Sequence, residues 1–298
     1  MGLCAIGVAT AIVWTQGQRP SPNDTVPRSI PADSVHEVVI NVRPGDSLAA
    51  VGEQLTTVGL VDSAELFVAT ARSRTPPVEV VEPGFYVVTP GRQPPEVVAQ
   101  LTDPTSRVGL LTVQGGRQLD DMTDPATGSV TQGLLSEIAA ATCVPTGGGR
   151  RCVSVEDLRQ SAALSDPAAL GIPGWAREPV SAMAGDHRRV EGLIGVGRWN
   201  FDPTATPAQI LSTLITGTAA RYDQNSVLQT AAREHRLTPY QVLIVASLLQ
   251  RDSEPAGYRG AAVEMYDRLR GPDGWDLPPA PVTVPSLEAL AAAEHPNG

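Results

Sequence analysis

Hydrophobic and polar positions alternate between strand and helix periods over the first third of the chain. Residues 38–42 form a β-branched apolar run, which predicts a strand, and Pro44-Gly45 predicts a turn after it. Residues 48–58 carry apolar side chains at helical spacing, and Asp46 or Ser47 is placed to cap that helix. The pattern therefore predicts a strand–turn–helix unit beginning near residue 37.

A second helix, a strand and a third helix follow. Ser63 predicts a helix start, with Leu66, Phe67 and Ala71 facing a core. Residues 83–88 predict a strand, and prolines at the first turn predict a helix from residue 94.

The strand–turn–helix pattern then recurs. Residues 108–113 predict a strand, Gly115-Gly116 a turn, and residues 117–122 the beginning of a helix. Two such units are similar to a small α+β module of the LysM type, which we place at residues 37–123.

From Val153 onward the pattern is mostly helical. Ser154 begins a capping-box arrangement, and helices are predicted at about 207–217, 223–236 and 238–252. Gly217 is expected to end the first of these. The third helix is apolar on almost every side, which indicates a buried helix.

Composition narrows the function. The net charge is −10, all 22 basic residues are Arg, and no Lys occurs anywhere in the chain. An acidic surface excludes a basic stripe for nucleic acid. The absence of Lys excludes a lysine Schiff base and a P-loop lysine. We expect no cofactor and no nucleic-acid partner.

The N-terminal residues suggest attachment to a membrane. Residues 2–14 are apolar, but thirteen residues are too few to span a bilayer as a helix. We interpret residues 1–16 as a remnant membrane anchor, with a buried N-terminal helix as the alternative. Residues 17–36 are polar and Pro-rich, as expected for a linker. The predicted location is the cell membrane, single-pass, with an extracytoplasmic domain.

Cysteine and histidine spacing bears on disulfides and metals. Cys143 and Cys152 flank a Gly-rich loop that allows a disulfide, and two unpaired thiols are the alternative. The four histidines, at positions 36, 187, 235 and 295, show no ligand spacing and are expected at the surface. We expect no metal site.

Five segments, in the same order, resemble one known family. Residues 42–48 with 60–67 are similar to its opening module, and residues 82–88 to its Lys-x-Gly-x-Tyr strand. Val190-Glu191-Gly192-Leu193-Ile194 is similar to its Leu-Glu-Gly-Tyr-Leu stretch, and residues 237–248 to its central helix. Leu277-Pro278-Pro279 is similar to its Gly-Leu-Pro-Pro-Gly-Pro-Ile segment. On these motifs the chain resembles the MltG (YceG-like) endolytic murein transglycosylases from about residue 37 to 296.

The resemblance implies a fold and an activity. The fold is α+β: a LysM-like small α+β module at 37–123, then a mostly helical, truncated catalytic-type domain at 124–298. The activity is that of a murein lytic transglycosylase, a lyase acting on polysaccharide. It cuts peptidoglycan glycan strands and leaves 1,6-anhydro ends. One carboxylic acid protonates the glycosidic oxygen, and the sugar's own 6-hydroxyl then closes onto the anomeric carbon.

The family's general acid is a glutamate, and here that position is Gln250. An amide donates no useful proton, so the loss is expected to be about 100- to 10,000-fold. The family's second acidic position falls on Asp252. Glu254 would share the helical face of Gln250 if the helix continued, although Pro255 opposes this. Glu191 lies on the Glu-Gly motif. Glu254 and Glu191 are therefore the candidates for a relocated acid. The alternative for Glu254 is a solvated carboxylate at the end of the helix, and the alternative for Glu191 is a structural hydrogen-bond acceptor.

Other residues are candidates for substrate contact by resemblance or by chemistry. Ser247 belongs to the Ala-Ser pair of the central helix, and Arg268 to a segment similar to the family's Val-Phe-x-Asn-Arg-Leu. Trp199 and Trp175 could stack on sugar rings, although core burial is the commoner fate of a tryptophan. A Met-x-Leu-Gln segment that the family carries after Arg268 is missing here.

Two functions remain in competition. The first is a membrane-anchored, peptidoglycan-associated member of the family with a degenerate active site. It would be a binding or scaffold paralogue in cell-wall elongation or division, with cell-wall synthesis proteins as further partners. The second is a working transglycosylase whose acid has moved to Glu254 or Glu191.

Overall fold

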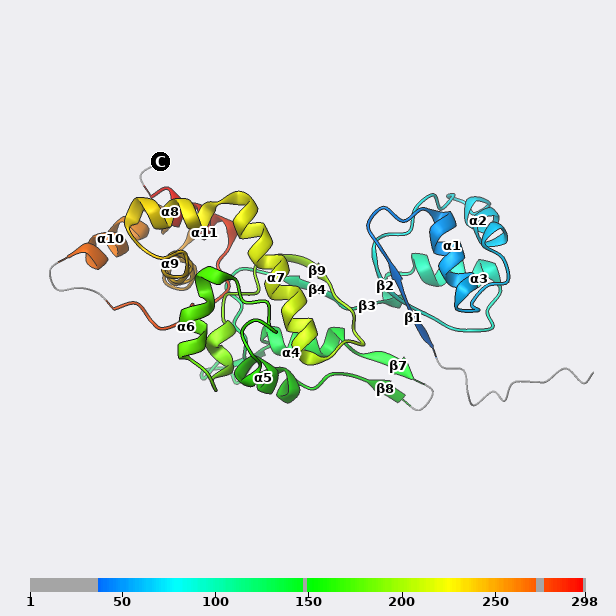
Figure 1. Ribbon diagram of the computed structural model, residues 1–298, viewed down its shortest axis with the longest axis horizontal. Coiled ribbons are helices and arrows are strands. Elements are labelled where there is room, and N and C mark those ends of the chain that lie inside the picture. Colours follow the sequence, from blue (N-terminus) through cyan, green and yellow to red (C-terminus); the bar gives the residue numbers. More distant parts are fainter. Residues whose placement is uncertain (1–36, 147–148, 272–275, 297–298) are drawn as a thin grey trace, which may run out of the picture. The chain divides into compact units, whose positions relative to one another are not determined.

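The computed structural model describes residues 37–146, 149–271 and 276–296 (Figure 1). Helices dominate, and the strands form small antiparallel sheets. This is the α+β class that the sequence predicts. The predicted anchor at 1–16 and the linker at 17–36 lie outside the described residues. Within the described residues, no helix combines the length and the apolar character that a membrane span requires.

The first hydrophobic core lies between a three-stranded sheet and three helices. The sheet has the order β1-β2-β3, and Ile40 of β1 pairs with Tyr86 of β2. Both side chains are buried in the core, together with Phe67. The elements are β1 (Val38–Val42), α1 (Leu48–Thr57), α2 (Ala64–Arg72), β2 (Gly84–Val88), α3 (Pro94–Thr102), η2 (Pro104–Ser106) and β3 (Arg107–Val108).

Local signals in the sequence set the helix boundaries of this region. Ser47 and Ser63 accept the backbone N–H groups of Ala50 and Leu66, so both predicted caps are confirmed. Phe67 and Ala71 are buried as predicted, whereas Leu66 is half exposed and its prediction was wrong. Leu66 lies one position away from the buried stripe, which is too narrow to include it.

The second core is larger and mostly helical. It is built around α9, whose residues 242–249 are all buried. Its elements are β4 (Leu110–Val113), β5 (Met122–Thr123), β6 (Val130–Thr131), α4 (Leu134–Ala141), β7 (Val144–Thr146), β8 (Gly149–Arg151), α5 (Val155–Leu164), η3 (Gly174–Ala176), α6 (Arg177–Ala182), η4 (His187–Val190), β9 (Gly197–Asn200), α7 (Pro207–Asn225), α8 (Val227–His235), α9 (Pro239–Asp252), η5 (Pro255–Gly257), α10 (Tyr258–Arg270) and α11 (Leu287–Glu294).

Residues 110–123 belong to this second core. β4 pairs with β9, and Leu111, Val113 and Leu119 are buried among the residues of the large core. Residues 117–122 form no helix, so the predicted second strand–turn–helix unit was wrong. β4 is therefore packed with the larger core, although the module predicted from the sequence extends to residue 123.

α7 continues through Gly217, where the sequence predicts a break. The helix runs from Pro207 to Asn225, and Gly217 lies within it against the indole of Trp199. A Cβ at position 217 would lie 2.7 Å from the ring. The glycine therefore provides close packing between a helix and a strand, and a cap was the wrong interpretation.

Cys143 and Cys152 form a disulfide across the β7–β8 hairpin. The bond joins residues nine positions apart, at the base of the hairpin. Disulfides of this kind persist in oxidising compartments.

Candidate functional site

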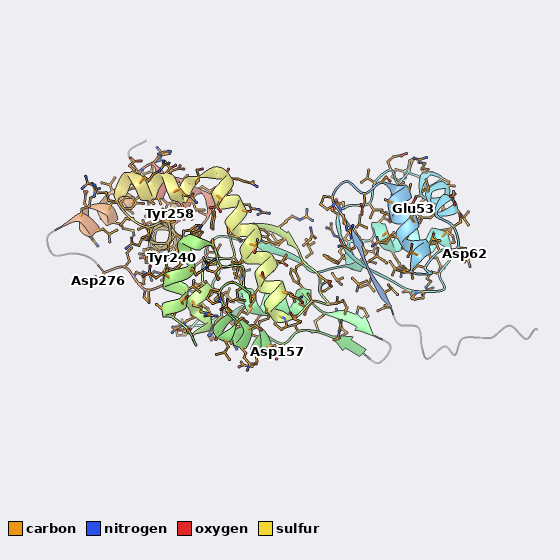
Figure 2. All side chains as sticks on the ribbon, viewed as in Figure 1. Glu53, Asp62, Asp157, Tyr240, Tyr258 and Asp276 are labelled. Atoms are coloured by element: carbon orange, nitrogen blue, oxygen red, sulfur yellow. A yellow bond between two sulfur atoms is a disulfide. The ribbon has the colours of Figure 1, made fainter. Side chains whose placement is uncertain are left out.

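The buried helix α9 and a proline-containing segment after α10 define the region of the candidate site. We call residues 278–282 the proline wall. Figure 2 labels Tyr240, in the first turn of α9, and Tyr258, the first residue of α10. The hydroxyl of Ser247, on α9, accepts the backbone N–H of Val282 at 3.1 Å, and Thr283 donates its hydroxyl to the Ser247 carbonyl. These bonds fix the proline wall against the helix.

Ser247 is fully buried, and its hydroxyl also donates to the carbonyl of Ile244. Both hydrogen-bonding functions of this hydroxyl are thus used inside the protein. The role in substrate contact predicted for Ser247 finds no exposed atom to support it. Its position instead supports the wall of the site.

Gln250 is a partnered, half-buried amide. Its Oε1 accepts the backbone N–H of Ser286, the N-cap residue of α11, at 3.1 Å. Its side chain also lies against the turn at Gly115 and Gly116, where added Cβ atoms would lie 3.1 Å and 3.7 Å from the amide. The amide therefore links α9, this turn and the start of α11.

The other acidic candidates after Gln250 lie at the surface. α9 ends at Asp252, and Glu254 lies beyond it in extended backbone, so Glu254 does not share the helical face of Gln250. Asp252 pairs with the neighbouring Arg251, and the hydrogen bonds from Arg251 hold the pKa of Asp252 below its usual value. A low pKa keeps a carboxyl ionised and unsuited to proton donation.

Glu191 has the opposite environment. Only 7% of the residue is exposed. Its Oε2 accepts the backbone N–H of Leu119 at 3.1 Å, whereas Oε1 has no hydrogen-bond partner among the described residues. Burial raises the pKa of Glu191 to about 8. This carboxyl is therefore largely protonated at neutral pH.

Asp120 is a second carboxyl in the same region, and no sequence motif pointed to it. Its Oδ2 lies 2.7 Å from Nε2 of His187, and its Oδ1 accepts from Nε of Arg159 at 2.9 Å. Burial opposes ionisation of Asp120, but these hydrogen bonds outweigh it and lower the pKa. His187 is thus partly buried and partnered, contrary to the surface position predicted for it.

A cavity of about 450 Å³ brings the two carboxyl residues together. Glu191, Asp120, Arg251 and the proline wall are all part of its lining. The volume falls within the range of small-molecule sites. The lining residues are Gln118, Asp120, Met183, Asp186, Arg188, Glu191, Arg251 and residues 278–282.

Trp199 and Arg268 do not line this cavity. Trp199 is 8% exposed, its Nε1 donates to the Gly195 carbonyl, and the Arg221 guanidinium lies 3.7 Å from its ring centroid. The indole lies beneath Arg221 and beside Gly217, so little of it is exposed for contact with a sugar ring. Arg268 is exposed on α10, near Glu264.

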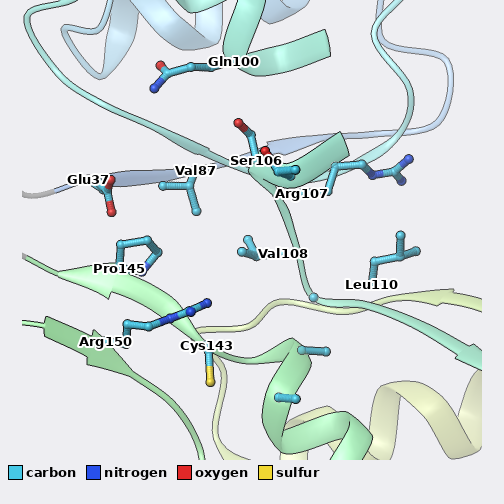
Figure 3. A pocket seen from close by; sticks show the side chains of 14 residues that line it. Glu37, Val87, Gln100, Ser106, Arg107, Val108, Leu110, Cys143, Pro145 and Arg150 are labelled. Atoms are coloured by element: carbon cyan, nitrogen blue, oxygen red, sulfur yellow. The ribbon is translucent and has the colours of Figure 1, made fainter. Parts of the chain in front are cut away.

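A smaller cavity of about 280 Å³ surrounds the β3–β4 connection (Figure 3). It is lined in part by Ser106, Arg107 and Val108. Of the site residues predicted from the sequence, Cys143 alone lines it, and that sulfur is used in the disulfide. Among the described residues, no cluster of three or more His, Cys, Asp or Glu side chains is arranged to hold a metal ion.

Comparisons with known proteins agree with the motifs. The model of the YceG-like family matches residues 40–272. The chain belongs to the YceG-like family. The family is that of MltG-type transglycosylases, and it points at a coarse level to peptidoglycan as the substrate. The matched range contains both Glu191 and Gln250 and ends before the proline wall.

One solved structure is similar at low identity. It is a YceG-like protein of Listeria monocytogenes, with 14% sequence identity and a TM-score of 0.48. The similarity covers 88% of this chain and 91% of that chain. A comparison with curated proteins found no match.

Proposed function

We propose that this protein binds peptidoglycan glycan strands in the extracytoplasmic space, with the family's acid position at residue 250 no longer serving as a proton donor. The observation that carries the proposal is the Gln250 amide, within a chain that belongs to the YceG-like family. A primary amide has no acidic proton to give to a glycosidic oxygen. Any cleavage of strands by this chain requires another acid.

Support for the compartment comes from the Cys143–Cys152 disulfide, since structural disulfides form in oxidising surroundings. Attachment to the membrane through residues 1–16 and a LysM-like role for the module predicted at residues 37–123, which contains the first core, are parts of the same proposal. The first core then serves as a separate module for contacts with glycan or with cell-wall synthesis proteins.

The cavity beside α9 is the proposed strand-binding site. It combines an apolar side, formed by the proline wall and Met183, with hydrogen-bonding groups on Gln118 and Asp120. A sugar ring has two matching kinds of surface, because its C–H faces are apolar and its hydroxyl edges form hydrogen bonds. Well-formed cavities with a few polar groups are the preferred places for small ligands.

Co-sedimentation of the full chain with purified, uncrosslinked glycan strands tests the proposal. We expect the native protein to sediment with the strands and to stay in the supernatant when the strands are omitted, at matched ionic strength. A large residue in the cavity, Ala280→Trp, should abolish sedimentation. Ala261→Trp, at a half-buried position on α10 outside the cavity, is the size-matched control, with folding of both variants checked by circular dichroism. Failure of the native chain to bind strands contradicts the proposed function.

A further inference from the structure

The cavity holds two carboxyl groups in opposite protonation states. Glu191 is buried, with one oxygen bonded to the Leu119 N–H and the other unpartnered among the described residues. Asp120 is one-third exposed and bonded to two cationic or proton-donating side chains, His187 and Arg159. Pairs of carboxyl groups whose surroundings separate their pKa values in this way divide into an acid and a fixed anion.

The unpartnered oxygen of Glu191 is a feature that a purely structural carboxyl would not need. Buried polar atoms are almost always hydrogen-bonded, and an orphaned oxygen costs free energy unless a ligand or another group satisfies it. A structural acceptor for the Leu119 N–H requires only one of the two carboxyl oxygens. The other oxygen is buried without a partner, in a residue that lines the cavity.

The charged and polar groups around Glu191 shift its pKa in both directions. The Asp120 carboxylate favours the protonated form, while Arg188 and the backbone N–H groups of Leu119 and Gly192 favour the ionised form. Asp186 pairs with Arg188 and offsets its charge, Arg251 pairs with Asp252, and the phenol of Tyr240 lies near without a hydrogen bond to it. Desolvation outweighs the groups that favour ionisation.

We propose that Glu191 is the proton donor of this chain and Asp120 its fixed anion, so that the cavity beside α9 cleaves glycan strands despite Gln250. The inference rests on the proposed strand binding and adds an activity to it. In the first step the Glu191 carboxyl gives its proton to the glycosidic oxygen. The bond from that oxygen to the anomeric carbon breaks, with its electron pair going to the oxygen.

The second step returns the proton. The oxygen of the sugar's own 6-hydroxyl attacks the anomeric carbon, and its proton goes to the Glu191 carboxylate. The products are a free hydroxyl on one fragment and a 1,6-anhydro end on the other, with no water consumed. The Asp120 carboxylate stabilises the positive charge that develops at the anomeric carbon between the two steps. Its bonds to His187 and Arg159 keep it ionised throughout.

The test measures cleavage and binding on the same samples. The full chain is incubated with purified glycan strands, 1,6-anhydro ends are counted by mass spectrometry, and co-sedimentation is recorded in parallel. Glu191→Gln removes the proton and preserves the shape and the acceptor for Leu119. Glu254→Gln is the matched control, because the same substitution is made on an exposed carboxylate outside the cavity.

We expect the native chain and Glu254→Gln to form 1,6-anhydro ends at rates within about twofold of each other. Glu191→Gln should reduce the rate about 100- to 10,000-fold with strand binding retained. Full activity in Glu191→Gln, or binding by the native chain without any anhydro ends, overturns the assignment of Glu191 and leaves strand binding intact. Absence of binding by the native chain overturns the proposed function itself.

The pH profile of the native chain keeps the test independent of any variant. A proton donor with a raised pKa loses its proton on the alkaline side, so cleavage should fall as pH rises through about 8. Strand binding, measured over the same pH values, should change less. A cleavage rate that stays constant from about pH 6 to 10 contradicts Glu191 as the acid.

Discussion

Two regions beside α9 carry the polar side chains that the family comparison singles out, and they differ in how completely those side chains are partnered. At Gln250, the amide oxygen binds the Ser286 N–H and the side chain lies against the Gly115-Gly116 turn. At Glu191, one carboxyl oxygen is buried without a partner, and the residue lines a cavity. A partnered amide holds structure together, whereas a desolvated, half-partnered carboxyl retains a proton that can be transferred.

The largest effect is expected from exchanging the two side chains. The double variant Glu191→Gln/Gln250→Glu should remain about 100-fold or more below the native cleavage rate. A carboxyl at position 250 would accept the Ser286 N–H at the start of α11, which favours its ionised form. The count of 1,6-anhydro ends checks this prediction. Recovery of the native rate by the double variant would show that position 250 can still act and would remove the contrast between the two regions.

The second largest difference between the two regions is expected in the pH dependence of the free energy of unfolding. The pKa of Glu191 is raised by folding from 4.5 to about 8, so the folded protein binds more protons than the unfolded chain between these values. The resulting contribution to stability is fully present below about pH 4.5 and is lost as pH rises through about 8. The loss is on the order of a few kcal/mol.

Urea unfolding of the native chain and of Glu191→Gln at pH 5, 7 and 9 measures this contribution. The free energy of unfolding of the native chain should fall relative to the variant between pH 5 and pH 9. Gln250→Glu, which adds an ionisable group in the other region, should show no such fall. Parallel curves for the native chain and Glu191→Gln would mean that the carboxyl is not buried in the way described.

A smaller effect is expected at Ser247, which holds the proline wall. Ser247→Ala removes the acceptor of the Val282 N–H and should cost about 1–3 kcal/mol in the free energy of unfolding. Because the wall lines the cavity, strand binding should weaken as well. Ser253→Ala, at the C-cap of α9, is the control and should change both quantities much less.

The smallest effect is expected at Gln250 itself. Gln250→Ala removes one acceptor, the partner of the Ser286 N–H, and should cost about 1 kcal/mol in the free energy of unfolding. Its rate of strand cleavage should stay within about threefold of the native rate, in contrast to Glu191→Gln. A loss of cleavage as large as that of Glu191→Gln would assign chemistry to the amide region after all.

Local signals allowed much of the secondary structure to be predicted. Helix starts at Ser47, Ser63 and Ser154 follow from capping hydrogen bonds within three or four residues of chain. The buried character of α9 follows from apolar residues on all its faces. The family is likewise visible in the order of short motifs, and the assignment of Gln250 to its glutamate position follows from the same resemblance.

Only part of the candidate site could be predicted from the sequence. Glu191 was a candidate through its motif, but its raised pKa depends on burial by segments far away in the chain. Asp120 and His187 are 67 positions apart, and no local pattern joins them. The same limit explains why Trp199 was expected to meet sugar, since Arg221 and Gly217, which cover it, lie on a different element.

The sequence by itself determined where helices begin and which helix is buried, and it places Gln250 at the position that resembles the family's glutamate. Helix starts and the burial of a helix depend on hydrogen bonds and apolar spacing among residues that are close in the sequence. The tertiary structure alone decided that residues 110–123 join the larger core, that α7 continues through Gly217, and that Glu191 and Asp120 share a cavity. Burial and long-range contacts produce these properties, because desolvation depends on everything packed around a group.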